Sequence, residues 1–135
     1  MKILAVDYGE KRIGLALGDT ESKLALPYGV LERQADELVL ERLQQILLAE
    51  DIGLVVVGEP VTLGHKASQQ TQTTRAFADF LKAHLAIPVA LCDERFTSQR
   101  ADAAMRGAGA PTRSRDELAA MFILQDYLER PTLKD

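Results

Sequence analysis

The sequence contains one cysteine, no tryptophan and few aromatic residues, which make up 5% of its 135 residues. Because the sequence has no second cysteine besides Cys92, an intramolecular disulfide is excluded and a reducing compartment is expected. So few aromatic rings argue against a surface on which single-stranded bases stack. No apolar run approaches a membrane span, and the apolar stretch of residues 1–6 is too short for a signal peptide. These absences predict a cytoplasmic protein with no membrane partner.

Positive charge is also in short supply, and the formal net charge is −4. This balance speaks against a nucleic-acid partner, since Lys and Arg carry most phosphate binding. The charges are unevenly distributed, however: residues 32–51 contain six acidic and two basic residues, whereas residues 96–115 contain four arginines and one aspartate. Such asymmetry suits a protein with one basic face, although ordinary solvated surfaces would also account for it.

The length and the 47% hydrophobic content suit a single domain, residues 1–135, with one core. Alternating or unbroken apolar residues predict strands at 2–6, 13–18, 24–31, 54–57 and 89–92. The second of these strands has one face of small residues, Gly14, Ala16 and Gly18. Helical spacing predicts helices at 36–50, from about Phe77 to Leu85 with His84 on its apolar face, at 97–105, and from a capping box of Ser114 and Glu117 onward.

The order of these elements predicts an α/β fold. The first three strands are joined by short turns and form an antiparallel meander, whereas the last two follow helices and are therefore parallel. The expected architecture is a five-stranded mixed sheet, with three antiparallel strands plus two parallel strands and helices on both faces.

Acidic residues follow the strands at one edge of this sheet, where open α/β sheets bind their ligands. They are Asp7, Glu59, Asp93 and Glu94, and Asp116 joins them from the first turn of the last helix. Carboxylates gathered in one place repel one another unless a cation compensates. Mg²⁺ or Mn²⁺ prefers oxygen ligands and leaves positions open for water and phosphate oxygens. Each acid also has a simpler interpretation, as a turn former, a helix cap or a loop residue.

A pair of such ions can activate a water on one side of a phosphodiester bond and stabilise the leaving oxygen on the other. The two histidines, His65 and His84, are poor candidates for a zinc site. A metal-dependent nuclease is therefore the expected class. A rival comes from the D-x-G motif at Asp7, which also cradles phosphates in two-lobed ATPases. A chain of this length provides only one such lobe.

Four stretches, in the same order, resemble the YqgF (RuvX) family: DYGEKRIGLA at 7–16, VVGEP at 56–60, DERFTS at 93–98 and DELAAMFILQDYL at 116–128. The resemblance implies an RNase H-like fold, shared with Holliday-junction resolvases, and a nuclease that matures the 5′ end of precursor 16S ribosomal RNA. It implies that Asp7, Glu94 and Asp116 are the metal-binding, catalytic carboxylates. It also implies that Lys11, Arg12 and Arg95 contact phosphate or brace the site.

Two positions depart from the family pattern. Glu59 stands where an apolar residue is usual, so Glu59, like Asp93, is a further candidate metal ligand. Leu63-Gly64-His65 stands in place of a D-G turn. The remaining candidates for binding the nucleic-acid backbone by charge are Arg106, Arg113 and Arg115.

Two other functions stay open at this point. One is resolution of Holliday junctions in branched DNA, for which a homodimer would be expected because a junction has two-fold symmetry. The other is a non-catalytic module that binds RNA or the ribosome. The main expectation is cleavage of precursor ribosomal RNA with Mg²⁺ or Mn²⁺.

Overall fold

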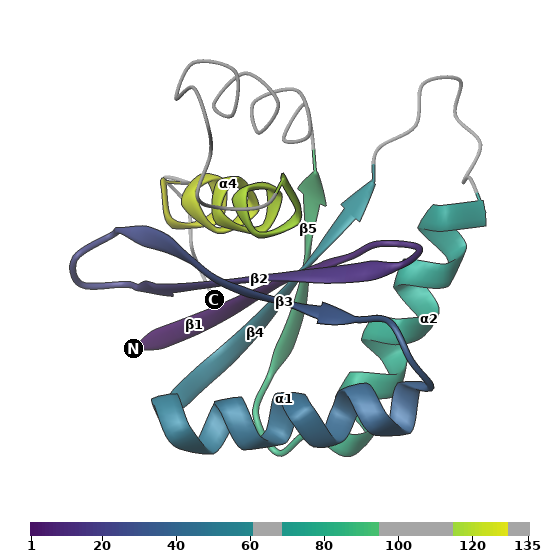
Figure 1. The fold of residues 1–135 in the computed structure, drawn as a ribbon. Helices are drawn as coiled ribbons and strands as arrows, with labels where there is room; N and C mark the ends of the chain where they lie inside the picture. The colour runs from purple at the N-terminus through teal and green to yellow at the C-terminus, as the bar shows by residue number, and fades with distance from the viewer. Residues whose placement is uncertain (61–68, 95–114, 130–135) are drawn as a thin grey trace.

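A computed structural model describes residues 1–60, 69–94 and 115–129 and has a mixed five-stranded sheet at its centre (Figure 1). The elements in chain order are β1 (Lys2–Tyr8), β2 (Arg12–Asp19), β3 (Ala25–Glu32), α1 (Asp36–Glu50), β4 (Ile52–Pro60), α2 (Gln69–His84), β5 (Val89–Glu94) and α4 (Arg115–Glu129). The strand order across the sheet is β3-β2-β1-β4-β5. β1, β2 and β3 pair antiparallel, whereas β4 pairs parallel with both β1 and β5. The predicted α/β class and the mixed sheet are confirmed.

Most predicted elements lie where the sequence pattern put them. α1 has the predicted bounds, and its C-cap residue Asp51 has a left-handed φ of 57° and donates its backbone N–H to the Leu47 carbonyl. β4 and β5 are longer than their apolar runs and continue through Glu59 and Glu94. The predicted helix at 97–105 and the capping residue Ser114 lie outside the described residues.

The expectation for His84 was wrong. His84 is the exposed last residue of α2, and its Nδ1 lies 2.8 Å from the Phe80 carbonyl. Leu85, which the pattern included in the helix, follows the end of α2 and is only half-buried. Within the described ranges, no helix has the length and apolar character needed to span a bilayer.

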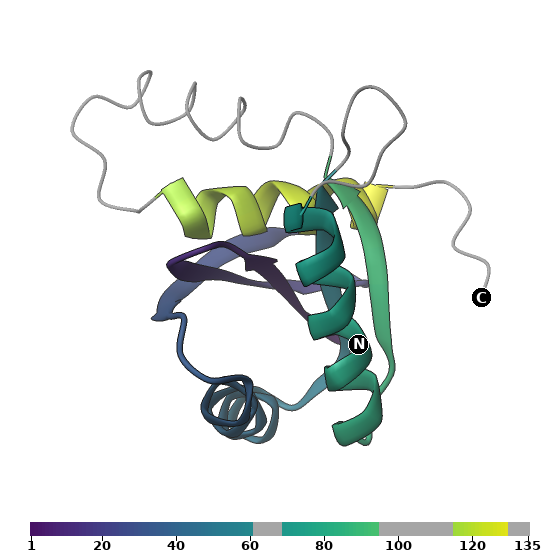
Figure 2. The same cartoon turned by 90° about the vertical axis from the view of Figure 1, so that its right-hand side faces the viewer.

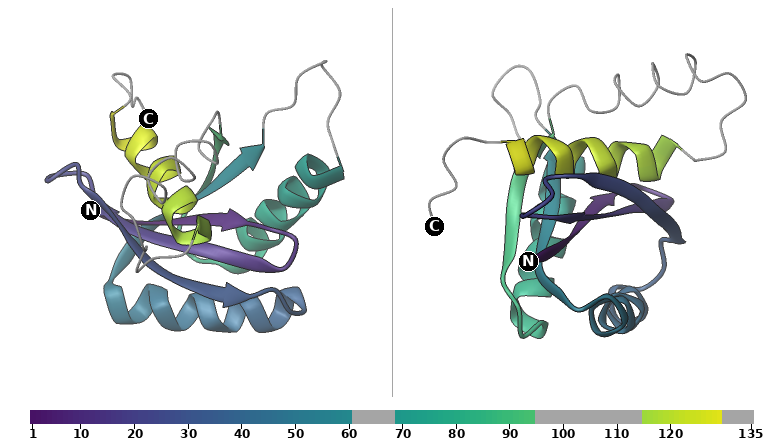
Figure 3. Two further views of the ribbon diagram at one scale, coloured as in Figure 1. Left: turned by 45° about the horizontal axis from the view of Figure 1, so that its top comes forward. Right: turned by 90° about the vertical axis from the view of Figure 1, so that its left-hand side faces the viewer.

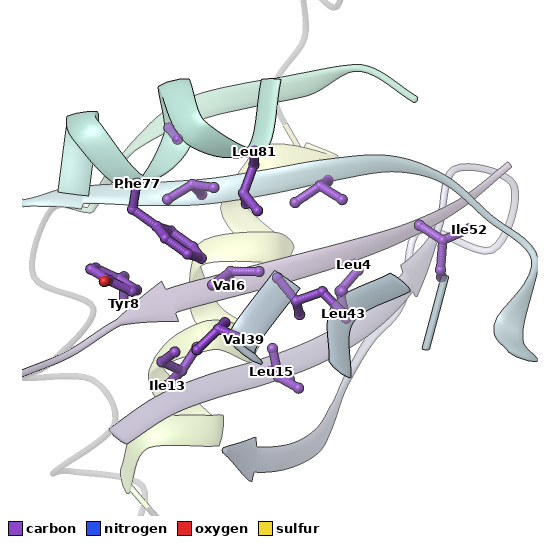
Figure 4. Packing of buried hydrophobic residues seen from close by; sticks show 13 residues of the cluster. Leu4, Val6, Tyr8, Ile13, Leu15, Val39, Leu43, Ile52, Phe77 and Leu81 are labelled. Carbon is purple, nitrogen blue, oxygen red and sulfur yellow. The ribbon is translucent and has the colours of Figure 1, made fainter. Parts of the chain in front are cut away.

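Helices cover both faces of the sheet, as predicted. Figures 1 and 2 show α1 and α2 on one side and α4 on the other. Two buried clusters correspond to these two sides. The first joins alternate residues of β1 and β2 to Phe77 and Leu81 of α2 and to Leu43 of α1 (Figure 4). The second is built around Ile123 and Leu124 of α4, and each such buried side chain stabilises the fold by roughly 1.5–3 kcal/mol.

Strand alternation decides which residues meet α4. Along β1, Leu4, Val6 and Tyr8 belong to the cluster under α1 and α2, whereas Ile3 and Ala5 belong to the cluster under α4. Because side chains alternate along a strand, Asp7 continues the row of Ile3 and Ala5 on the α4 side. The first carboxylate of the expected site therefore lies on the face that α4 covers.

Helix α4 packs across β2, as Figure 3 shows, and it covers the face of β2 that carries the small residues. Ala16 is fully buried in the α4 cluster. A Cβ placed on Gly18 would meet Leu124 Cδ2 at 2.8 Å, which shows how closely the middle of the helix approaches the strand. Small residues on this face are therefore required by the close packing of α4.

Candidate active site

Asp7 lies near the carboxyl end of the central strand β1, where its side chain is half-buried. Its partner in the antiparallel register is Gly14 of β2, and the preceding residue Val6 pairs with Val57 of β4. Asp7 thus lies between neighbouring strands on both sides. A carboxylate in this position is held by the central strand of the sheet.

The first turn of α4 contacts β2 directly beside Asp7. A Cβ placed on Gly14 would lie only 2.0 Å from the backbone oxygen of Asp116 and 3.0 Å from the backbone nitrogen of Glu117. A side chain at position 14 would therefore collide with the helix backbone. Because Gly14 is the register partner of Asp7, this contact brings Asp116 next to Asp7 on the same face of the sheet.

Arg12 binds the Asp116 carboxylate across the edge of the site. Its Nε donates a hydrogen bond to Asp116 Oδ2 at 2.9 Å, a charge-assisted contact between residues far apart in the sequence. The Asp116 side chain is 20% exposed and the Arg12 side chain 61% exposed. The pair therefore lies at the boundary between the protein surface and the α4 interface.

The turn between β1 and β2 carries Lys11 and Arg12 and is firmly braced. The Gly9 N–H bonds to the Arg12 carbonyl at 3.0 Å, which closes the turn so tightly that a Cβ on Gly9 would lie 2.5 Å from that oxygen. The Arg33 guanidinium donates to the Gly9 carbonyl, and the Arg33 backbone N–H donates to the Lys11 carbonyl. These bonds fix the backbone that presents both cationic side chains.

Tyr8 anchors the same turn from the opposite face of the sheet. Its ring stacks on Phe77 with centroids 4.0 Å apart (Figure 4), and the Arg33 guanidinium carbon lies 4.3 Å from its centroid. Its hydroxyl donates to Asp36 Oδ1 at 2.9 Å, and Gln70 Nε2 donates to its backbone carbonyl. Burial, followed by the hydrogen bond to Asp36, raises the pKa of Tyr8 to about 12. Tyr8 therefore stays neutral and links β1 to α1 and α2.

Glu59 is bound to Arg75 of α2. Arg75 Nε contacts Glu59 Oε2, and the Glu59 side chain is 15% exposed. Glu59 continues the row of Val55 and Val57, which belong to the cluster on the α1 and α2 side. This side of the sheet is opposite to the one on which Asp7 and α4 lie.

The other expected site residues are only partly described. Asp93 and Glu94 end β5 and pair in register with Glu59 and Pro60. Lys11 is exposed in the β1–β2 turn, and Arg115 is exposed at the start of α4. Arg95, Arg106 and Arg113 lie outside the described residues. Among the side chains that are described, no three His, Cys, Asp or Glu residues come together in a metal-binding group.

Solved structures identify the fold class of the protein. The chain superposes on Thermus thermophilus RuvC bound to a Holliday junction substrate with a TM-score of 0.62, at 17% identity, covering 95% of this chain and 94% of that one. It superposes on the Fowlpox virus resolvase bound to Holliday junction DNA with a TM-score of 0.60, at 15% identity, covering 96% and 97% of the two chains. The fold is therefore the RNase H-like fold of these resolvases, as expected.

Sequence comparison supplies the family. Residues 1–130 match the RuvX family, described as a Holliday junction resolvase, so the chain belongs to that family. Proteins described as "Putative pre-16S rRNA nuclease" in Maridesulfovibrio salexigens and Koribacter versatilis are 36% and 37% identical over 134 and 133 residues. The matches cover 96% of this chain in both cases and 99% and 87% of the relatives. The predicted class, an enzyme that hydrolyses phosphodiester bonds, is confirmed.

Sequence reasoning missed the contacts that hold the site together. The Arg12–Asp116 pair and the Arg75–Glu59 pair join separate elements, and no local spacing pattern signals either one. The bracing role of Arg33 had no signal beyond its place next to the third strand. The face of small residues on β2 was recognised, but the packing of the Asp116 backbone against this face was not predicted.

Proposed function

We propose that this protein is a divalent-metal-dependent nuclease of the cytoplasm that acts on the 5′ end of precursor 16S ribosomal RNA. The nuclease class follows from the family. The substrate is taken from the names that the relatives carry, and the roles of individual residues come from the geometry at the end of β1. Asp7, Glu94 and Asp116 are the proposed metal-binding carboxylates.

One observation carries the assignment: the first turn of α4 rests on Gly14, the register partner of Asp7. Two carboxylates separated by more than a hundred positions in the sequence are thereby placed on one face, at one end of the sheet. Neighbouring carboxylates in a half-buried position repel each other unless a positive charge compensates, so this arrangement suits a bound cation.

The donor set fits a hard divalent cation. Carboxylate oxygens are the ligands that Mg²⁺ and Mn²⁺ prefer, and the three proposed ligands, Asp7, Glu94 and Asp116, are all carboxylates. Such an ion, when bound, lowers the pKa of a coordinated water and stabilises charge on the reacting phosphate. Asp7 would hold it from the rigid central strand, and Asp116 from the helix.

The chain's own cationic residues would bind and orient the substrate. Lys11 and Arg12 project from the braced β1–β2 turn, and Arg115 precedes Asp116, so all three lie at the same end of the sheet. Their charges would hold phosphates on either side of the scissile bond. Arg95, Arg106 and Arg113 are proposed to extend this contact. Because phosphate contacts release counterions, RNA binding should weaken as the salt concentration rises.

The test compares cleavage of a precursor 16S 5′-leader RNA and of a four-way DNA junction, each with Mg²⁺, with Mn²⁺ and with EDTA. Asp7→Asn, Glu94→Gln and Asp116→Asn should each abolish cleavage. Asp79→Asn is the matched control, since Asp79 is an exposed carboxylate on α2, on the far side of the sheet. Cleavage that survives EDTA or Asp116→Asn would refute the proposed site.

The fold likeness to two junction-bound resolvases supports a second candidate, resolution of branched DNA. Metal-dependent cleavage of the junction with no cleavage of the leader RNA would select it. RNA binding that needs neither metal nor Asp7, with no cleavage of either substrate, would instead indicate a non-catalytic module.

A further inference from the structure

Arg12 forms an ion pair with Asp116, whose carboxylate is one of the proposed metal ligands. Its Nε lies 2.9 Å from Asp116 Oδ2, at hydrogen-bonding distance. A carboxylate oxygen that accepts a hydrogen bond from a guanidinium group has less electron density to donate to a cation. The positive charge of Arg12 also repels a divalent ion nearby. Metal binding at Asp116 and the Arg12 ion pair therefore compete.

The pair is poorly explained as a stabilising contact. Arg12 is 61% exposed at the first residue of β2, and ion pairs this exposed contribute little to stability. The first turn of α4 is already held by the contact between Gly14 and the Asp116 backbone. The helix dipole also favours a negative charge at this position without any counter-ion.

We propose that Arg12 is a built-in counter-ion that takes the place of the divalent cation at Asp116 in the metal-free protein and is displaced when the cation binds. Arg12 neutralises Asp116 beside Asp7, so the site avoids like-charge repulsion in the metal-free state. Displacement frees a guanidinium on a rigid turn, where it can meet a substrate phosphate. Arg12 is thus a positioning residue that sets the metal affinity. This inference rests on the proposed metal site.

The first test measures Mn²⁺ binding to the intact protein by calorimetry at low ionic strength. Arg12→Gln removes the competitor and should bind Mn²⁺ roughly two- to five-fold more tightly than the wild type. Arg12→Lys keeps the charge and should stay close to the wild type. Arg42→Gln is the matched control, because it removes one exposed arginine charge from α1 on the other side of the sheet and should leave binding unchanged.

The second test follows the Nε–H resonance of Arg12 by NMR during a titration with diamagnetic Mg²⁺. It should move as the ion displaces the guanidinium, whereas the Arg42 resonance should not. Weaker Mn²⁺ binding by Arg12→Gln would show that Arg12 braces Asp116 for the metal, and this result would overturn the proposal. Unchanged Mn²⁺ binding by Arg12→Gln, or an Arg12 resonance that does not move, would overturn it as well.

These outcomes are separable from failure of the metal site itself. If Asp7→Asn and Asp116→Asn lose Mn²⁺ binding while Arg12→Gln matches the wild type, the site stands and only the displacement is wrong. If the wild-type protein binds no Mn²⁺, or binds it equally well without Asp7 and Asp116, the site and the displacement both fall.

Discussion

Replacing Gly14 by alanine should move Asp116 of α4 away from Asp7 of β1. The added Cβ would lie 2.0 Å from the Asp116 backbone oxygen, so the first turn of α4 must retreat by about 1.4 Å to reach ordinary contact at 3.4 Å. Forcing one extra carbon into a well-packed interface costs about 1–3 kcal/mol. Alanine is the better residue in a strand interior by roughly 0.5–1 kcal/mol, which offsets only part of this loss. A displacement of about 1 Å at a catalytic group can lower the rate about 100-fold.

Two glycine variants of the same sheet serve as controls. Gly29→Ala adds a Cβ with nothing within 4 Å, so its stability should change by less than about 0.5 kcal/mol. Gly18→Ala presses on the Leu124 side chain, farther along α4, and on the Leu24 backbone oxygen, and should lower stability while affecting cleavage less than Gly14→Ala does, because Gly18 lies farther from Asp116. Urea unfolding followed by circular dichroism measures stability in a chain without tryptophan. Wild-type stability, Mn²⁺ affinity and cleavage in Gly14→Ala would refute the placement of α4 over Asp7.

Three further predictions concern groups outside the carboxylate pair. The pKa of Tyr8 is raised to about 12, so folding favours its neutral form. The contribution of Tyr8 to stability is complete below pH 10 and should be lost as the pH rises through 12. The midpoint of urea unfolding should therefore fall less over this pH interval in Tyr8→Phe than in the wild type. Glu59→Gln should leave Mn²⁺ affinity unchanged and cost at most about 1 kcal/mol through the contact with Arg75, whereas a loss of Mn²⁺ binding would place Glu59 among the ligands. Cys92 is 2% exposed beneath α4, so a thiol reagent should label it only when the helix opens; fast labelling of the native protein would contradict this packing.

The sheet was predictable because its signals are local. Alternating apolar residues and short turns define β1 to β3, and the unbroken run at Val55–Val57 marks a strand covered on both faces. Helix α1 was predicted to the residue because acids begin it and a glycine closely follows its end. His84 was misplaced for a related reason. The spacing of apolar residues predicts how far a helix continues, but it does not show where the sheet that the helix packs against ends.

For the candidate site, the sequence could propose residues but not their contacts. Asp7 and Asp116 could be named from the sequence, and their shared face follows from the parity of β1 and from the small residues of β2. The ion pair of Arg12 could not be predicted, since its geometry depends on where α4 crosses the sheet. Glu59 is two residues beyond Val57 in β4. Because side chains alternate along a strand, this spacing alone places the Glu59 side chain on the face that α2 covers.

Helix α4 joins stability and chemistry in one element. Its apolar residues Ile123, Leu124 and Leu128 are buried against the sheet, and this hydrophobic contact holds the whole rigid rod in place. Its first turn carries Asp116 and precedes these residues, so the position of that carboxylate depends on the anchoring farther along the helix. A cavity at Leu124 should therefore weaken metal binding through Asp116 as well as stability. A cavity of similar size at Leu43, under α1, should lower stability alone, because α1 lies on the other face of the sheet.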